Sequence, residues 1–69
     1  MPLASMNAGE TGQVVRVGGS PKVRMHLENL GFVEGTTVRV VSIVNGNLIV
    51  QVKDARVAIS RELACKIWV

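Results

Sequence analysis

The chain has 69 residues, 48% of them hydrophobic and 19% charged, and its eight Lys and Arg against five Asp and Glu give a net charge of +3. Such a composition predicts one small folded domain over residues 1–69 and excludes a disordered or highly charged tail. The single cysteine excludes an internal disulfide, and the sequence has neither a signal peptide nor an apolar run long enough to cross a bilayer, so we expect a cytoplasmic protein.

The first twenty residues predict a loop followed by a short strand. Leu3 and Met6 are the apolar residues of the opening loop that can anchor it to a core. The turn GETG then precedes the segment QVVRV, whose β-branched residues predict a strand over Gln13–Val17. The glycines of GGSPK end this strand.

A short helix is expected from Pro21 to Leu30. Ser20 is a typical N-cap, and proline suits the first helical position because its missing N–H has no partner there. Val23, Leu27 and Leu30 recur at the i, i+4, i+7 spacing of one helical face, which predicts that they face the core. His26 lies at the edge of that face.

The segment LENLGFVEG predicts how the helix ends. Gly31 occupies the position where a helix C-terminus often needs a positive φ, which glycine adopts at little steric cost. Phe32 can then fold back on the last helical turn. From Thr37 onward the chain is rich in β-branched residues, so a strand follows.

The rest of the chain predicts short strands joined by tight turns. Val38 and Val40 share one strand face while Val41 and Ile43 share the other, and this change of phase predicts a β-bulge. A hairpin turn is expected over residues 45–47, a return strand over 48–53, a strand over 57–59, one helical turn capped by Ser60, and a final strand KIWV.

These elements predict a mainly β fold. About five short strands, with one short α-helix between the first two and a single helical turn before the last, are typical of a small SH3-like barrel. Closure into a barrel is how so little chain protects its sheet edges.

The residues suggest no catalytic group and no cofactor. Nucleophilic catalysis needs a nucleophile, a base and an orienting group within mutual reach, and the chain offers one His, one Cys and a few serines in turns. The segment VGGSPK lacks the spacing and the ending of a phosphate-binding loop. We therefore do not expect an enzyme.

The conceivable metal ligands are spread along the chain without the spacing that metal sites require. They are His26, Cys65, Glu10, Glu28, Glu34, Asp54 and Glu62. His26 is therefore interpreted as a partly buried packing residue, and Cys65 as a small buried hydrophobe beside the last strand. The sequence thus assigns no metal ligand.

A basic RNA-binding barrel is the alternative function, because small barrels bind RNA and the net charge is +3. The basic residues, however, are scattered singly, and single-strand binders usually provide aromatic stacking platforms. Here the only aromatic residues are Phe32 and Trp68. The same scarcity argues against a proline-peptide SH3 domain.

The order of seven residues resembles the L-x-x-L-G-[apolar]-x-x-G-x-x-[apolar]-x-[apolar] core of the ferrous iron transport protein A family (FeoA-like). They are Leu27, Leu30, Gly31, Phe32, Gly35, Val38 and Val40. The opening around Leu3 and Val14, the late strand Val57–Ile59 and the ending at Glu62, Ala64, Ile67 and Val69 are also similar to that family. One departure is Glu34, since the family often has proline before the second glycine.

The resemblance implies a cytoplasmic SH3-like barrel that acts with a membrane ferrous-iron transporter carrying a GTP-binding domain. Its role would be to support bacterial Fe(II) uptake without catalysing a reaction, and it implies an association with transition metal ions without naming a ligand. The barrel also resembles the C-terminal domain of iron-dependent repressors, but this chain lacks their DNA-binding helices.

The expected helix presents a candidate partner-binding face formed by Arg24, Met25 and Glu28. At about 100° per residue, Met25 projects nearly opposite the apolar face, and an outward methionine is a hint of a docking surface. The alternative docking surface is the strand face and loop around Arg39, Asn45 and Asn47.

Overall fold

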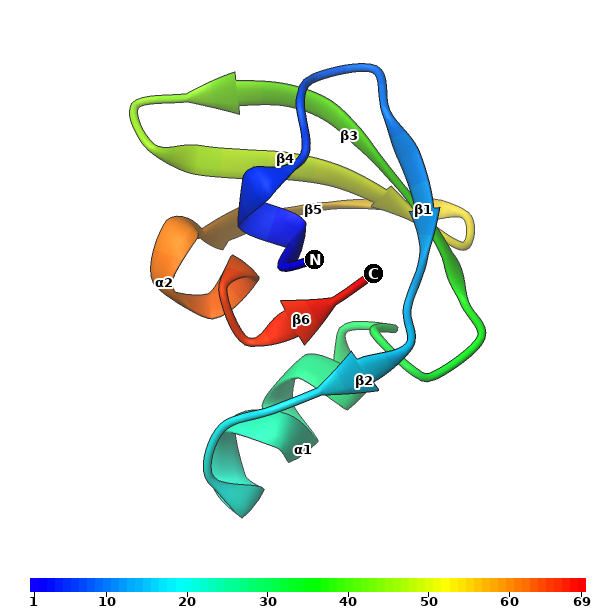
Figure 1. Cartoon of the computed structure of the whole chain (residues 1–69), viewed down its shortest axis with the longest axis vertical. Coiled ribbons are helices and arrows are strands. Elements are labelled where there is room, and N and C mark those ends of the chain that lie inside the picture. The colour runs from blue at the N-terminus through cyan, green and yellow to red at the C-terminus, as the bar shows by residue number, and fades with distance from the viewer.

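Six short strands and two short helices bend around one apolar interior in the computed structural model, which describes residues 1–69 (Figure 1). The chain begins with a 3₁₀ turn at Leu3–Ser5. There follow β1 (Thr11–Gln13), β2 (Arg16–Val17), α1 (Pro21–Asn29), β3 (Thr37–Val44), β4 (Asn47–Val52), β5 (Ala55–Ser60), α2 (Arg61–Ala64) and β6 (Ile67–Trp68). The predicted mainly β fold is confirmed.

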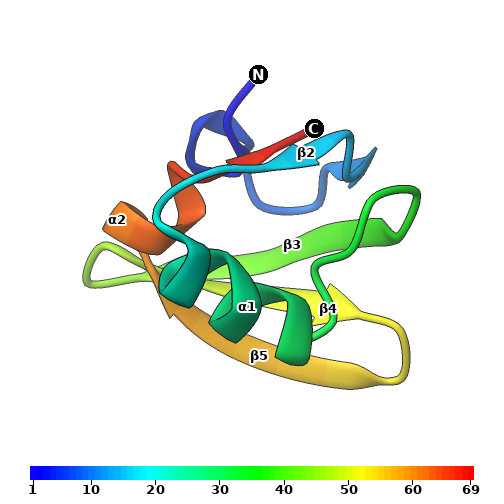
Figure 2. The same cartoon turned by 90° about the horizontal axis from the view of Figure 1, so that it is seen from below.

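The strands form two antiparallel sheets. The larger has the order β1-β3-β4-β5, and the smaller pairs β2 with β6. α1 lies beside β2 and away from the turn between β3 and β4 in Figure 1, and in Figure 2, which looks from below, it lies in front of the larger sheet. The two sheets close the barrel by facing each other across the core.

The predicted strand over Gln13–Val17 is wrong in its bounds, because the chain changes sheets in its middle. The N–H of Val14 donates to Thr36 O (2.9 Å), whereas the N–H of Val15 donates to Trp68 O (2.8 Å). The segment is therefore divided between β1 and β2, which brings the strand count to six and places α1 after the second strand.

The expected bulge and hairpin turn are both present. The register between β3 and β4 shifts between Val40 and Ser42, which leaves Val41 without a paired residue. Asn45 and Gly46 have φ values of 50° and 79°, as a two-residue hairpin turn requires. In the next turn Lys53 also has a positive φ, 53°, which the sequence did not indicate.

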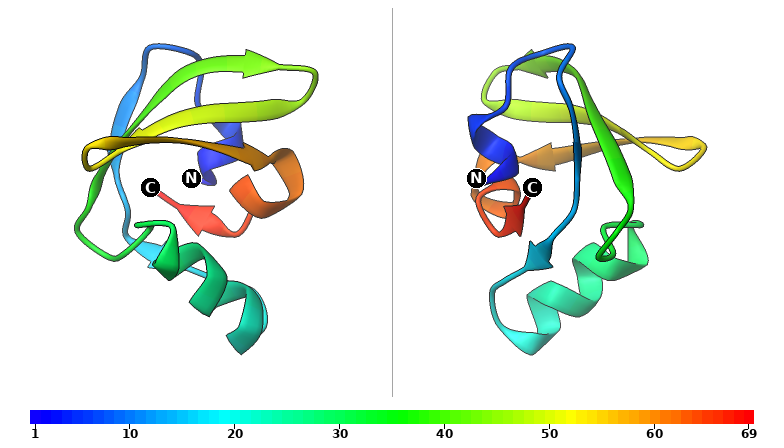
Figure 3. Two further views of the ribbon diagram at one scale, coloured as in Figure 1. Left: turned by 180° about the vertical axis from the view of Figure 1, so that it is seen from behind. Right: turned by 45° about the vertical axis from the view of Figure 1, so that its right-hand side comes forward.

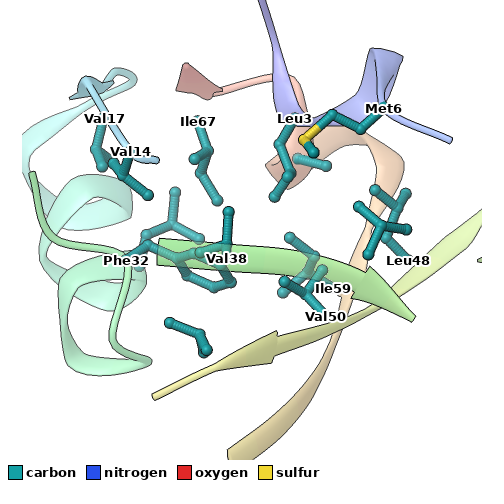
Figure 4. Close-up of a cluster of buried hydrophobic side chains, with 14 residues drawn as sticks. Leu3, Met6, Val14, Val17, Phe32, Val38, Leu48, Val50, Ile59 and Ile67 are labelled. Atoms are coloured by element: carbon teal, nitrogen blue, oxygen red, sulfur yellow. The ribbon is translucent and has the colours of Figure 1, made fainter. Parts of the chain in front are cut away.

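The core contains 14 buried residues, and all of them are apolar. Figure 4 shows the side chains of Leu3 and Ile67 pointing toward Val38 from the opposite side of the barrel. The full set is Leu3, Met6, Val14, Val17, Leu27, Phe32, Val38, Val40, Leu48, Val50, Val52, Ile59, Ala64 and Ile67. The two expected anchors of the opening loop, Leu3 and Met6, belong to this set.

The two ends of the chain are joined by hydrogen bonds. The N-terminal ammonium of Met1 donates to Val69 O at 2.7 Å, and the N–H of Val69 donates to Met1 O at 2.8 Å. Pro2 forms an isolated bridge with Trp68. The opening residues therefore extend the β2–β6 sheet. As for membrane insertion, no helix of the protein combines the length and the apolar character that crossing a bilayer requires.

Candidate functional site

The start of α1 is fixed by the residues that the sequence indicated. Ser20 has an extended backbone, and its hydroxyl accepts a hydrogen bond from the N–H of Val23 at 3.3 Å. Pro21 is the first helical residue. The cap thus satisfies one of the N–H groups that the first helical turn leaves without a partner. Proline at the first helical position has no N–H that would need one.

The end of α1 is a complete Schellman motif. The N–H of Gly31 donates to Glu28 O at 3.0 Å, and the N–H of Phe32 donates to Leu27 O at 3.1 Å. Gly31 has a φ of 110°, and a Cβ added there would come within 3.3 Å of Val52 Cγ2. Phe32 is fully buried. The positive φ favours glycine here, an added Cβ would be tight against Val52, and the motif fixes the direction of the helix against the sheet.

The helix is held to the core mainly through one residue. Leu27 is fully buried, whereas Val23 and Leu30 are partly buried and pack against the edge of the core. Arg24, Met25 and Glu28 are exposed, and the side chain of Met25 is 63% exposed. The three residues of the candidate partner-binding face therefore lie at the surface, as the helical geometry predicts.

A groove of about 370 Å³ runs beside this helix. Its lining comes from β2, from α1 and from the turn between Gly31 and Gly35, and consists of Arg16, Val17, Arg24, Glu28, Val33 and Glu34. Two of the three candidate helix residues line the groove. Met25 lies outside it, so the structure separates the methionine from the polar pair.

The turn that forms one wall of the groove is tied to the crossing between the two sheets. The N–H of Gly35 donates to Val14 O at 2.7 Å, and the side-chain amide of Gln13 donates to Gly35 O at 2.9 Å. These bonds hold Val33 and Glu34 beside β2. Val33 is 40% exposed, so the groove has an apolar residue at its rim.

Both signs of charge meet in this groove. Arg16 and Arg24 contribute guanidinium groups, and Glu28 and Glu34 contribute carboxylates. The guanidinium of Arg16 also lies over the ring of Trp68, 5.2 Å from its centroid, which is a cation–π geometry. Such a lining suits a protein segment that carries charges of both signs.

Sequence reasoning missed Arg16, Val33 and Glu34 as neighbours of the helix. Each is unremarkable in its own segment, and only the crossing at Val14 and the Schellman turn bring them beside α1. Val33, an apolar residue in a short segment between Gly31 and Gly35, was the one available signal, because such a turn usually runs over the surface.

The interpretations of His26 as a partly buried packing residue and of Cys65 as a small buried hydrophobe are wrong. Both residues are exposed: His26 lies on α1 at the edge of its apolar face, and Cys65 follows the end of α2. No group of three or more His, Cys, Asp and Glu residues gathers where it could hold a metal ion.

The alternative surface is exposed too, but its residues do not form one cluster. Arg39 lies near the start of β3, whereas Asn45 is in the turn beyond its end and Asn47 begins β4. The role of either surface in binding a partner stays a prediction.

Comparison with known proteins links the chain to one family. A family model described as FeoA domain matches residues 1–69. Among solved structures, an iron uptake regulatory protein, FeoA, is 33% identical with a TM-score of 0.88, and the match covers 96% of this chain and 88% of that one. No curated protein sequence matches the chain.

Two further FeoA structures have the same fold. FeoA from Stenotrophomonas maltophilia, complexed with zinc and described as an SH3 domain protein, is 27% identical with a TM-score of 0.86, covering 99% of this chain and 87% of that one. The FeoA protein from Chlorobium tepidum is 27% identical with a TM-score of 0.89, covering 99% and 67%. The predicted SH3-like barrel is thereby confirmed.

A manganese-dependent transcriptional repressor contains a similar barrel. It is 25% identical with a TM-score of 0.91, and the match covers 100% of this chain but 40% of the repressor. The barrel is therefore found both in FeoA proteins and as one part of a longer regulatory chain.

Proposed function

Because the chain belongs to the FeoA domain family, which is linked to ferrous iron transport, we propose that it is a non-catalytic adaptor of a bacterial ferrous-iron transporter. It docks on the GTP-binding component of the transporter from the cytoplasmic side and supports Fe(II) uptake. The description of the Stenotrophomonas maltophilia protein as a candidate activating factor of ferrous iron transport favours this role.

The observation that carries the proposal is the exposed flank of α1. It combines an outward methionine with a groove lined by two arginines, two glutamates and the rim valine Val33. Interfaces are typically built from such exposed apolar anchors with polar groups around them. Met25 is the anchor, and the groove beside Arg24 and Glu28 receives charged side chains of the partner.

The test is a double substitution, Arg24→Glu with Met25→Asp. Both side chains are exposed, so the variant is expected to fold with a near-wild-type melting temperature. It is expected to lose recovery of the transporter from detergent-solubilised membranes and to support Fe(II) uptake poorly. Loss of a central interface anchor typically costs about 2 kcal/mol or more of binding free energy.

The matched control is Arg61→Glu with Ala8→Asp, which changes the net charge by the same amount at exposed positions away from α1. This control is expected to recover the transporter normally. If both double variants lose recovery equally, the effect comes from net charge; if neither does, the docking face lies elsewhere on the protein.

A further inference from the structure

The four-stranded sheet gathers basic residues that are far apart in the sequence. The register pairs Thr11 with Arg39, Arg39 with Gln51, and Gln51 with Arg56, so these four residues form one row across β1, β3, β4 and β5. The row lies on the side of the sheet that faces away from the core, because the neighbouring residues Val38, Val40, Val50 and Val52 are the buried ones.

We call this side the outer face. Its register-paired residues are Gln13, Thr37, Thr11, Arg39, Gln51, Arg56, Ser42, Ile49, Ala58, Val44, Asn47 and Ser60. The left view of Figure 3 shows β3, β4 and β5 from behind, with the N-terminal turn on their far side.

The side-chain hydrogen bonds support the basic row. Arg56 Nε donates to Gln51 Oε1 at 3.3 Å, and Gln51 Nε2 donates to the backbone oxygen of Lys53 at 3.1 Å. Gln51 thus lies between Arg39 and Arg56, which are two strands and about 10 Å apart. Lys53, in the turn after β4, adds a third positive charge beside this row.

Acidic residues are absent from the paired positions of the outer face. Of the five in the chain, Glu28 and Glu34 line the groove beside α1, Glu62 lies on α2, and Glu10 accepts a hydrogen bond from the N–H of Asn7. Only Asp54, in the turn with Lys53, is near the basic row. The fold therefore separates charges that are mixed along the sequence.

The other end of the outer face carries three aliphatic residues beside Ser42, Asn47 and Ser60. Val44 is 52% exposed, Ala58 is exposed, and Ile49, which pairs with Ala58 and Ser42, is partly buried. A surface with basic residues at one end and aliphatic residues at the other is suited to an interface that is both charged and apolar.

We propose that the outer face rests on an anionic lipid bilayer. Arg39, Lys53 and Arg56 contact acidic headgroups, and Val44 and Ile49 at the other end of the face reach the boundary between headgroups and acyl chains. Binding through three charges is weak by itself, so the contact orients the protein on the membrane rather than anchoring it.

The composition of this face favours lipid over RNA. Neither aromatic residue lies on it, since Phe32 is buried and Trp68 belongs to the β2–β6 sheet under Arg16. Single-stranded RNA binders place aromatic rings along a groove, whereas the groove of this protein lies beside α1. Exposed aliphatic side chains contribute to lipid binding and not to phosphate recognition.

This proposal goes beyond the adaptor function. It rests on that function only in so far as docking on a membrane transporter brings the protein close to a bilayer. The assay contains no transporter, so its failure and the failure of the adaptor function are distinguishable. The full chain is sedimented with vesicles of phosphatidylcholine and phosphatidylglycerol at 7:3, and with vesicles of phosphatidylcholine alone, at low and at high salt. Binding is expected only with the anionic vesicles at low salt.

The outer-face variant Arg39→Gln, Lys53→Gln, Arg56→Gln is compared with Lys22→Gln, Arg61→Gln, Lys66→Gln, which removes the same net charge from exposed positions elsewhere. The first is expected to lower the vesicle partition coefficient roughly fivefold per charge, or about a hundredfold in total, and the second much less. Circular dichroism melting checks the fold of both, and the salt dependence of the wild-type chain tests the proposal without any variant.

Three outcomes overturn the proposal. The wild-type chain does not sediment with anionic vesicles at low salt; or the two triple variants lose binding equally, so that net charge alone is responsible; or the chain binds single-stranded polyuridylate but not vesicles, in which case the outer face recognises nucleic acid.

Discussion

The α1 flank and the four-stranded sheet are attached to the same core in different ways. The sheet contributes a dense set of buried side chains from β3 and β4, whereas α1 contributes one fully buried residue, Leu27. The direction of the helix depends on hydrogen bonds at its two ends, the side-chain cap of Ser20 and the backbone bonds of the Schellman motif. Regions with few buried contacts open locally more easily, so the flank is the more adaptable of the two surfaces.

The charged residues of the two surfaces differ as well. The groove beside α1 carries two arginines and two glutamates, while the paired positions of the outer face carry arginines and no acid. A mixed surface can select one partner by its charge pattern, and a single-sign surface responds to the overall charge of whatever it meets. The surface that can select a partner is thus the one that is less tightly held to the core.

The largest effect is expected from Phe32→Ala, which removes the aromatic side chain where the helix end meets the sheet (Figure 4). Truncating a fully buried Phe typically costs about 3–5 kcal/mol, a large part of the stability of so small a domain. Urea unfolding followed by circular dichroism measures the loss. A cost below about 1 kcal/mol would mean that the two regions do not share one core.

Leu27→Ala is expected to cost about 2–5 kcal/mol, because Leu27 is the only fully buried residue of α1. Leu30→Ala removes the same atoms from a partly buried position and is expected to cost clearly less. Comparing the urea unfolding midpoints of the two variants shows how far the attachment of the helix depends on Leu27 alone. Equal costs would show that Leu30 contributes as much as Leu27.

Gly31→Ala is expected to destabilise more than Gly35→Ala. Both glycines have positive φ, 110° and 87°, and such strain costs an L-residue about 1–2 kcal/mol. An added Cβ at Gly31 also approaches Val52 to 3.3 Å, whereas nothing lies within 4 Å at Gly35. Thermal melts of the two single variants compare the backbone cost with the additional packing cost. A reversed order would remove the spatial argument for Gly31.

The smallest effect is expected from the two helix caps. Ser20→Ala and Ser60→Ala each remove a hydroxyl that accepts a backbone hydrogen bond, at 3.3 and 3.2 Å, and each is expected to cost about 1 kcal/mol. Ser20→Ala is expected to increase amide hydrogen exchange within α1 while the strands keep their protection. Uniform loss of protection would show that the helix and the sheet unfold together.

Local patterns were sufficient to predict most of the fold. The Ser20 cap, the turn at Gly31, the bulge after Val40 and the Asn45–Gly46 hairpin each follow from residues close together in the sequence. The change of sheet at Val14 was not predictable in this way, because QVVRV reads as one strand and its two hydrogen-bond partners come from distant segments.

The candidate site was predicted only in part, for the same reason. Helical periodicity identified the exposed positions of Arg24, Met25 and Glu28, but not the groove that Arg16, Val33 and Glu34 build beside them. The exposure of Cys65 was also missed. A cysteine next to an apolar strand is usually buried, and here the end of α2 turns it outward.

The joining of the two chain ends imposes an order on folding. Leu3 and Ile67 meet in the core, and Met1 and Val69 share backbone hydrogen bonds, so this closure brings together the most distant parts of the sequence. The β3–β4–β5 meander needs only short loops and can form early, while the closure carries the largest loop-entropy cost and is expected to form last. Contacts that form late chiefly govern the unfolding rate. Substitutions at the joined ends should therefore shorten the lifetime of the native state while leaving the folding rate almost unchanged.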